Sequence, residues 1–418
     1  MSSSSPPPTY YVAFVTVAVL VLKAVNEEVR EPYMDEPFHV PQAQAYCRGD
    51  YWTWDPKITT PPGLYVLSLI LKKIFMLKCN LPMLRLTPML SLLTLPIVLT
   101  QLICYHKRER PPHSLASPPL EAVILASFPI AWFFGFLYYT ELPSLVSVVS
   151  TVVLAMQGRH WLAALVVYLR FRRAPPNEQP PPKLHDPPAL EAGPADLIWS
   201  ILSAPRVLPD ILLNFVPYAL VLVVFGAFVV WNGGIVLGDK ANHVPAFHVP
   251  QLYYFVGFAT AFGWPALLSG PSGVSILLHD VFSRMFGSKR IQHPFLLSDN
   301  RHYTFYIWRR VFLLHPVVPY LLVPGYIACA WAWYIRIGHD QTLLQNLLLP
   351  LFVVPTLLPT PLLEPRYFLI PYVLLRAQVK DVPLWGLVLE GVWYAAINGV
   401  TLWVFLYKER VGVGRFIW

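Results

Sequence analysis

The sequence has little charge. Only 13% of its 418 residues are Asp, Glu, Lys or Arg, whereas 56% are hydrophobic and the mean hydropathy is +0.50. Because soluble proteins carry about 25% charged residues, a water-soluble globular fold is excluded. Four uncharged runs are long enough to cross a bilayer core as helices. These runs cover residues 211–238, 249–278, 311–335 and 341–363. The sequence therefore predicts an all-α polytopic membrane protein.

Cysteine is also scarce. The four cysteines, Cys47, Cys79, Cys104 and Cys329, are far apart and lack the spacings of zinc sites and redox pairs. We therefore expect neither a metal site nor a disulfide framework. No P-loop, dinucleotide fingerprint, catalytic triad motif or nucleic-acid motif is visible in the sequence. The net charge of +8 is expected to meet lipid headgroups or phosphate rather than nucleic acid.

Apolar stretches follow one another along the chain and predict roughly ten to twelve transmembrane helices. Residues 1–9 are expected to form a disordered Ser/Pro tail, and residues 10–418 a single transmembrane domain. The expected spans are residues 10–25, 63–77, 84–105, 120–139, 142–156, a span beginning at 211, then 252–268, 311–334, 343–363, 367–375 and 385–406. The 44 prolines predict bent and broken helices.

Two long polar segments interrupt this pattern. Residues 26–62 are rich in acidic side chains and are expected to form a large lumenal loop, by the positive-inside bias. Residues 170–194 have the proline-rich composition of a flexible linker, which we place in the cytosol. Simple counting of spans puts the basic cluster at 106–110 on the same side as the acidic loop. The orientation of that part of the chain is therefore left open.

Asp35 and Glu36 lie in a proline-bracketed segment just after the first expected span. Adjacent carboxylates at a membrane surface can act as a general base, bind a cation or remain solvated. The same loop carries aromatic and hydrogen-bonding side chains of the kind that bind sugars, among them His39, Gln42, Trp54 and Asp55. An aromatic belt at the membrane interface explains the tryptophans equally well.

Three further polar islands lie between apolar stretches. The island at 293–310 contains Asp299, Asn300, Arg301 and His302; the island at 238–243 contains Asp239 and His243; and Glu364 and Arg366 form the third. Arginine offers a fixed fork of donors that suits phosphate or pyrophosphate. A structural ion pair between Glu364 and Arg366 is the alternative for the third island.

The pentapeptide FHVPQ occurs twice, at residues 38–42 and 247–251. Each copy lies downstream of an acidic residue and near the start of an apolar stretch. The repetition suggests a remnant of duplication, although the surrounding residues do not support an inverted repeat.

Four motifs occur in order from the first span nearly to the C-terminus. They are PYMDEPFHVPQAQAYCRGDYWTWDPKITTPPGLYVLS (32–68), GDKANHVPAFHVPQLYYF (238–255), HPFLLSDNRHYTFYIWRR (293–310) and LLEPRYFLIPY (362–372). Together they resemble the dolichyl-phosphate-glucose-dependent α-1,2-glucosyltransferases of N-glycan precursor assembly. The resemblance implies a GT-C glycosyltransferase in the endoplasmic reticulum membrane, with its active site facing the lumen. Its partners would be dolichyl phosphate glucose, the diglucosylated dolichyl-diphosphate oligosaccharide and membrane lipid.

The implied transfer turns a β-linked donor into an α-linked product, so a carboxylate must deprotonate the attacking 2-hydroxyl. We assign that base to Asp35, with Glu36 as the alternative. Arg366, Arg301 and His302 would stabilise the leaving phosphate, so no metal or other cofactor is expected. The residues assigned to the sugar and acceptor are His39, Gln42, Trp54, Asp55, Asp239, His243, Asp299 and Asn300.

The chain departs from the family after residues 156–160. The family usually carries another span there, opening with an FRQTN-like stretch, whereas here residues 167–173 lead directly into the proline-rich linker.

Three other functions are alternatives to the glucosyltransferase: a GT-C enzyme for another sugar, a non-catalytic scaffold and a secondary transporter. A transporter places its coupling acids near the bilayer midplane, whereas Asp35 and Glu36 lie in a long polar loop.

Overall fold

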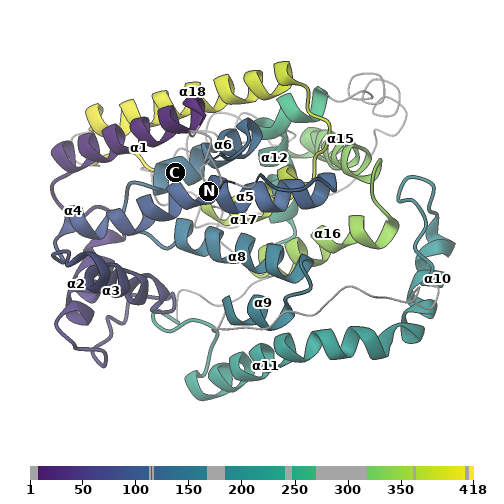
Figure 1. Ribbon diagram of the computed structural model, residues 1–418, viewed down its shortest axis with the longest axis horizontal. Coiled ribbons are helices and arrows are strands. Elements are labelled where there is room, and N and C mark those ends of the chain that lie inside the picture. Colours follow the sequence, from purple (N-terminus) through teal and green to yellow (C-terminus); the bar gives the residue numbers. More distant parts are fainter. Residues whose placement is uncertain are drawn as a thin grey trace, which may run out of the picture. The chain divides into compact units, whose positions relative to one another are not determined.

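The computed structural model describes residues 8–112, 114, 117–166, 184–240, 247–269, 318–360, 364–409 and 414–418. Within these residues the regular elements are helices and no strand is present (Figure 1). The α-helices are α1 (Thr9–Glu28), α2 (Glu36–Cys47), α3 (Gly63–Phe75), α4 (Leu81–Leu84), α5 (Leu86–Lys107), α6 (Leu120–Ala126), α7 (Pro129–Phe134), α8 (Glu141–Met156), α9 (His160–Val166), α10 (Pro194–Ser203), α11 (Leu208–Asn232), α12 (Pro250–Leu268), α15 (Val318–Gly338), α16 (Leu343–Leu357), α17 (Leu369–Ala377) and α18 (Leu384–Tyr407). Two short 3-10 helices are η1 (Ala204–Arg206) and η4 (Pro365–Phe368). The expected all-α class is confirmed for the described part of the chain.

Four helical stretches among the described residues are long and apolar enough to cross a membrane. They are Thr9–Glu28, Leu81–Lys107, Asn214–Asn232 and Leu384–Tyr407. The third is only 6% buried, so most of its apolar side chains face outward, as contact with lipid requires. The protein is therefore a membrane protein, as the hydropathy predicts.

The chain folds into two compact units. The first comprises Met1–Ser150, Val224–Val244 and Gly391–Trp418, and the second comprises Thr151–Val223 and Pro245–Glu390. In the first unit α1 packs against α5 and α6. The apolar stretch at 120–139 is broken between α6 and α7, where Pro129 opens α7. Proline has no backbone N–H and its ring crowds the preceding turn, so this break follows the expected effect of proline.

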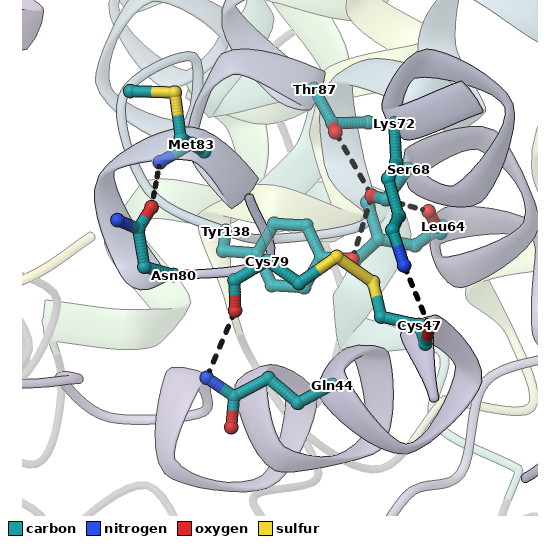
Figure 2. Close-up of a disulfide and its surroundings, with 10 residues drawn as sticks. All are labelled: Gln44, Cys47, Leu64, Ser68, Lys72, Cys79, Asn80, Met83, Thr87 and Tyr138. Carbon is teal, nitrogen blue, oxygen red and sulfur yellow. Dashed lines mark hydrogen bonds between the residues drawn. A yellow bond between two sulfur atoms is a disulfide. The ribbon is translucent and has the colours of Figure 1, made fainter. Parts of the chain in front are cut away.

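A disulfide joins Cys47, at the end of α2, to Cys79, just before α4 (Figure 2). The sequence-based expectation of no disulfide is therefore wrong. The two cysteines are separated by 32 residues, so no local spacing rule detects the pair. They meet because α3 folds back along α2, and the Gln44 amide supports the pair by donating to the Cys79 carbonyl at 3.1 Å.

The helix α3 packs beside α2 and is short for a membrane span. Its 13 residues extend over about 20 Å, short of the roughly 30 Å hydrocarbon core. Near its start, Leu64 shares a hydrophobic cluster with Val40 of α2. Near its end, Lys72 Nζ donates to the Cys47 carbonyl at 2.7 Å (Figure 2). Both ends of α3 contact the short polar helix α2, and α3 is not one of the four described helical stretches long and apolar enough to cross a membrane.

In the second unit α12 packs closely against α15. A side chain at Gly257 would meet the Tyr326 ring at 2.6 Å, and one at Gly263 would meet the Trp333 ring at 2.8 Å. Such small residues let apolar helices approach each other in a membrane. Trp333 Nε1 also donates to Thr260 Oγ1 at 3.1 Å, which satisfies the indole N–H between the helices.

The end of the proline-rich segment is held in place by backbone hydrogen bonds. The Leu343 N–H donates to the Pro187 carbonyl at 2.8 Å, and the Ala189 N–H donates to the Gln341 carbonyl at 2.9 Å. The Leu344 N–H donates to Asp186 Oδ1 at 2.9 Å. Residues 184–193, here called the strap, therefore bind to the turn between α15 and α16.

Candidate active site

A tight turn positions Asp35 at the start of α2. Met34 has a φ of 58°, a left-handed conformation that is uncommon for a residue with a side chain. Asp35 is the N-cap residue of α2, and its carbonyl accepts hydrogen bonds from the N–H groups of Phe38 and His39 at 3.0 and 3.1 Å. Asp35 itself is partly exposed. Strained turns of this kind cluster at functional sites, where the surrounding structure holds them in place.

Glu36, the next residue, is completely buried. Its carboxylate accepts two hydrogen bonds from the Arg85 guanidinium, at 2.8 Å from Nε and 2.6 Å from Nη2. It also accepts the backbone N–H groups of Tyr33 at 3.0 Å and Tyr138 at 2.7 Å. A buried carboxylate with four donors has its hydrogen-bonding capacity satisfied and fixes the groups around it. Glu36 therefore anchors the turn that carries Asp35.

Arg85 extends this anchor to the end of the first helix. Its side chain is also 0% exposed. Its Nη1 donates to the Val29 carbonyl at 2.8 Å and to Asn26 Oδ1 at 3.2 Å. The guanidinium thus joins the C-terminal end of α1, the Asp35 turn and the start of α5.

Tyr139 holds the turn from its other side. The Asp35 N–H donates to the Tyr139 hydroxyl at 2.9 Å, and that hydroxyl donates to the Tyr33 carbonyl at 3.4 Å. The ring of Tyr139 also lies 6.3 Å from the His39 ring, measured between centroids. The Tyr139 side chain therefore holds the Asp35 backbone directly, whereas the Tyr138 backbone N–H holds the next residue, Glu36.

Hydrogen bonds to Gln42 and to the backbone hold the candidate sugar-binding residues Trp54 and Asp55 in the acidic loop. Gln42 Nε2 donates to the Thr53 carbonyl at 2.7 Å, and Gln42 Oε1 accepts the Asp55 N–H at 2.9 Å. Trp54 Nε1 donates to the Ile58 carbonyl at 3.2 Å. Gln42 is thus a structural support for the loop. It holds Thr53 and Asp55, the residues on either side of Trp54, against α2.

His39 faces Tyr65 of α3, whose ring also contacts Trp54. Its Nδ1 is 2.6 Å from the Tyr65 hydroxyl. Burial raises the pKa of the Tyr65 phenol above its ordinary value, so the hydroxyl remains protonated and can donate to this nitrogen. His39 is only 8% exposed. The contact with Tyr65 therefore sets the orientation of the imidazole.

Asp239, from the far end of α11, contacts the same loop. Its N–H donates to the Pro56 carbonyl at 2.7 Å, and the Leu237 N–H donates to the Thr59 carbonyl at 3.1 Å. Asp239 has a φ of 44°, another left-handed residue. The structure thus brings together seven of the predicted site residues in the first unit: Asp35, Glu36, His39, Gln42, Trp54, Asp55 and Asp239.

The two copies of FHVPQ have matching roles in the two units. In the first, the Gln42 amide donates to the backbone of Thr53; in the second, the Gln251 amide donates to the Thr360 carbonyl at 2.9 Å. The histidine of each copy is buried, with His39 at 8% and His248 at 6% exposure. Each copy therefore ties an adjoining loop to the start of a helix.

Arg366 belongs to the second unit, where its Nε pairs with the Glu364 carboxylate. This ion pair is the structural alternative considered from the sequence, and it leaves the Arg366 side chain 24% exposed. The guanidinium also lies over the Tyr367 ring, 6.0 Å from its centroid. The other predicted site residues, His243, Asp299, Asn300, Arg301 and His302, lie outside the described residues.

Among the described residues, no group of three or more His, Cys, Asp or Glu side chains is arranged to hold a metal ion. Arg85 and Tyr139 were not predicted as site residues from the sequence. Arg85 had a detectable signature, because a single arginine in an apolar stretch must find a partner. Tyr139 had none, since it is one of 22 tyrosines.

Comparison with known proteins identifies relatives along nearly the whole chain. Proteins from Rattus norvegicus, Homo sapiens and Arabidopsis thaliana, each named Dol-P-Glc:Glc(2)Man(9)GlcNAc(2)-PP-Dol alpha-1,2-glucosyltransferase, are 34%, 33% and 31% identical to it. The alignments cover 96%, 96% and 94% of this chain and 96% of each relative. The rat alignment extends over 463 positions, more than the 418 residues here, so that relative carries residues without a counterpart in this chain. No solved structure matches the chain.

A family profile matches residues 29–172 and 191–377, and the interval between these segments contains most of the proline-rich stretch. The matched segments include the Asp35 turn, Arg85, Tyr139 and Arg366. With relatives of this identity over almost the full length, the match shows that the chain belongs to the DIE2/ALG10 family.

Proposed function

We propose that this protein is a hexosyltransferase that moves glucose from dolichyl phosphate glucose onto the diglucosylated dolichyl-diphosphate oligosaccharide. The new bond is an α-1,2 linkage, and the glucose is the third and last of the N-glycan precursor. The near full-length relatives that carry this activity in their names support the assignment. The observation that carries the chemistry is the difference between the two adjacent carboxylates at the start of α2.

Asp35 is the general base of the proposed reaction. Glu36 is 0% exposed and already accepts four hydrogen bonds, two of them from Arg85, so a substrate hydroxyl has no access to it. Asp35 is partly exposed on the rigid turn that Glu36 anchors. In the transfer, Asp35 takes the proton of the acceptor 2-hydroxyl while that oxygen attacks the anomeric carbon. The bond to the donor phosphate breaks on the opposite face, so the configuration inverts.

The leaving group of this reaction is dolichyl phosphate, which departs as an anion without a proton. Cationic side chains can stabilise it, and we assign this role to Arg366, Arg301 and His302 from their chemistry. The reaction then needs no metal ion. His39, Trp54, Asp55 and Asp239 are assigned to the sugar and acceptor, with His243, Asp299 and Asn300. Gln42 contributes by holding the Thr53–Asp55 backbone.

The proposed enzyme has a GT-C fold of ten to twelve spans in the endoplasmic reticulum membrane. Its large acidic loop and Asp35 face the lumen. The position of α3 beside α2 supports this orientation, because the chain then crosses once in α1 and returns in α4 and α5. The basic cluster at 106–110 then lies in the cytosol, as the positive-inside bias favours.

The test is glucose transfer by purified protein in lipid, from a dolichyl phosphate glucose analogue to a diglucosylated lipid-linked acceptor. Wild-type protein should form an α-1,2 product, with equal rates with and without chelator. Asp35→Asn should lower kcat by at least about 100-fold, the usual lower bound for a general base, with unchanged thermal stability. Donor analogues carrying mannose serve as the specificity control.

Three results would contradict the proposal. Transfer of mannose in preference to glucose would assign another sugar. Full activity of Asp35→Asn would remove Asp35 as the base. Loss of activity with chelator, restored by a divalent cation, would show that the leaving phosphate depends on a metal.

A further inference from the structure

The helix α10 turns its polar residues toward the protein. Asp196, Ser200 and Ser203 share one face of the helix, and the two serines are 1% and 6% exposed. Ser203 Oγ accepts the His185 N–H at 2.9 Å, and Asp196 contacts His185 Nε2 at 2.8 Å and the Gly193 N–H at 2.8 Å. Asp196 and Ser203 on the polar face of α10 are therefore hydrogen-bonded to the strap.

The opposite side of α10 is apolar and faces outward. Its side chains are 58%, 60%, 62% and 59% exposed, in the order Ile198, Trp199, Ile201 and Leu202. A surface helix in water has the reverse arrangement, with its apolar stripe buried and its polar face outward. An exposed apolar face of this kind marks contact with a membrane or another protein.

The position of α10 identifies lipid as the partner. Only residues 204–207 separate it from α11, whose segment Asn214–Asn232 is a candidate span. The exposed apolar surface continues into α11 through Leu212 and Phe215, at 52% and 43% exposure. Figure 1 shows α10 running across the direction of α11. A helix that turns across the start of a span lies in the plane of the membrane interface, where tryptophan is also favoured.

We propose that α10 is an in-plane helix whose apolar face is immersed among the headgroups and upper acyl chains of one leaflet of the membrane. The immersion does not rest on the proposed function. Through the strap, α10 then fastens the turn between α15 and α16 to the membrane surface.

The test is spin-label depth in the full-length protein reconstituted in phospholipid nanodiscs. One label is placed at Ile198→Cys in a background of Cys104→Ala and Cys329→Ala, which keeps the Cys47–Cys79 disulfide. Two reference labels bracket it: Glu191→Cys on the exposed strap, and Val223→Cys at the centre of the α11 span, where the native side chain is 68% exposed. Collision rates with oxygen, which enters lipid, and with a water-soluble nickel chelate give the depth of each label.

The label at 198 should lie between the two references, with more oxygen contact than the label at 191 and less than the label at 223. Nickel contact equal to that at 191 would place the face in water and overturn the proposal. Low contact with both reagents would show that protein, such as a second copy of the chain, covers the face, and would also overturn it. The measurement needs no turnover, so an inactive protein with an intermediate depth would remove the proposed function and leave α10 in the membrane.

Discussion

Asp35 and Glu36 are neighbours in sequence, yet they have opposite surroundings. One is partly exposed at the N-cap of α2, and the other is buried under an arginine and two backbone donors. Adjacent residues at a helix start point in different directions, so a short shift along the chain changes the environment completely. In the proposed reaction, the residue that takes the proton, Asp35, is therefore distinct from the residue that holds it in place, Glu36.

Removing either member of the buried Glu36–Arg85 pair should destabilise the protein strongly. Glu36→Gln or Arg85→Gln leaves the other group buried and uncompensated, which costs about 3–5 kcal/mol. The double substitution should cost clearly less than the sum of the two. Thermal unfolding in detergent, evaluated as a double-mutant cycle, measures this. Glu27→Gln, which breaks an exposed pair with Lys23, is the matched control and should change stability by less than about 1 kcal/mol. Additive losses from Glu36 and Arg85 would refute the coupling.

Arg366→Ala should impair use of the donor more than use of the acceptor. Loss of a hydrogen bond to a charged group costs about 1.5–3 kcal/mol, so the KM for the lipid-phosphate donor should rise about 10- to 100-fold. The KM for the acceptor should stay within a factor of about two, and Arg366→Lys should recover part of the loss because it keeps the charge. Steady-state rates at varied donor and acceptor distinguish these cases. An unchanged rate at limiting donor would remove Arg366 from the phosphate site.

At the scale of elements, the apolar pattern predicts most helices. In lipid there is no water to bond the backbone N–H and C=O groups, so an apolar segment must pair them within itself as a helix. Where the structure describes the expected stretches, they fold as helices, including the interrupted stretch at 120–139. The role of α3 was not predictable in this way. Its hydropathy resembles that of a span, and only the contacts of Lys72 and Cys79 with Cys47 place it beside α2.

The candidate site, too, is predictable from the sequence only in part. The sequence predicts the residues of the acidic loop, because their types suit sugars and proton transfer. It does not predict that Arg85 neutralises Glu36, since 49 residues separate them and many carboxylates are available as partners. It also does not rank Asp35 against Glu36, because burial depends on packing between α2, α5 and Tyr138.

The Cys47–Cys79 disulfide should stabilise the region formed by α2, α3 and the acidic loop. A cross-link that closes a loop of 32 residues restricts the unfolded chain by about 3–4 kcal/mol. Cys47→Ser and Cys79→Ser should therefore lower the unfolding temperature to the same extent as reduction of the wild type. The reductant should have no further effect on either variant. Cys329→Ser is the control and should retain the full response to reductant. A reductant response in Cys47→Ser would show that another bond is responsible.

At the scale of the whole molecule, the proposed topology predicts which residues face each compartment. In sealed microsomes, a membrane-impermeant maleimide should label Arg108→Cys directly. It should label Met76→Cys, at the exposed end of α3, only after permeabilisation, and Trp52→Cys, in the acidic loop, should behave in the same way. The free cysteines are replaced in all three proteins. Labelling of Met76→Cys in intact microsomes would show that α3 crosses the membrane.

The oxidation state of Cys47 and Cys79 also depends on the direction in which each molecule was inserted into the membrane. Cys47 and Cys79 can join only in an oxidising compartment, and cytosolic thiols remain reduced. A molecule whose first helix enters the membrane in the proposed direction therefore gains the bond, whereas an inverted molecule keeps two thiols. The oxidation state of this one pair, read after alkylation of newly made protein, thus separates correctly inserted chains from inverted ones.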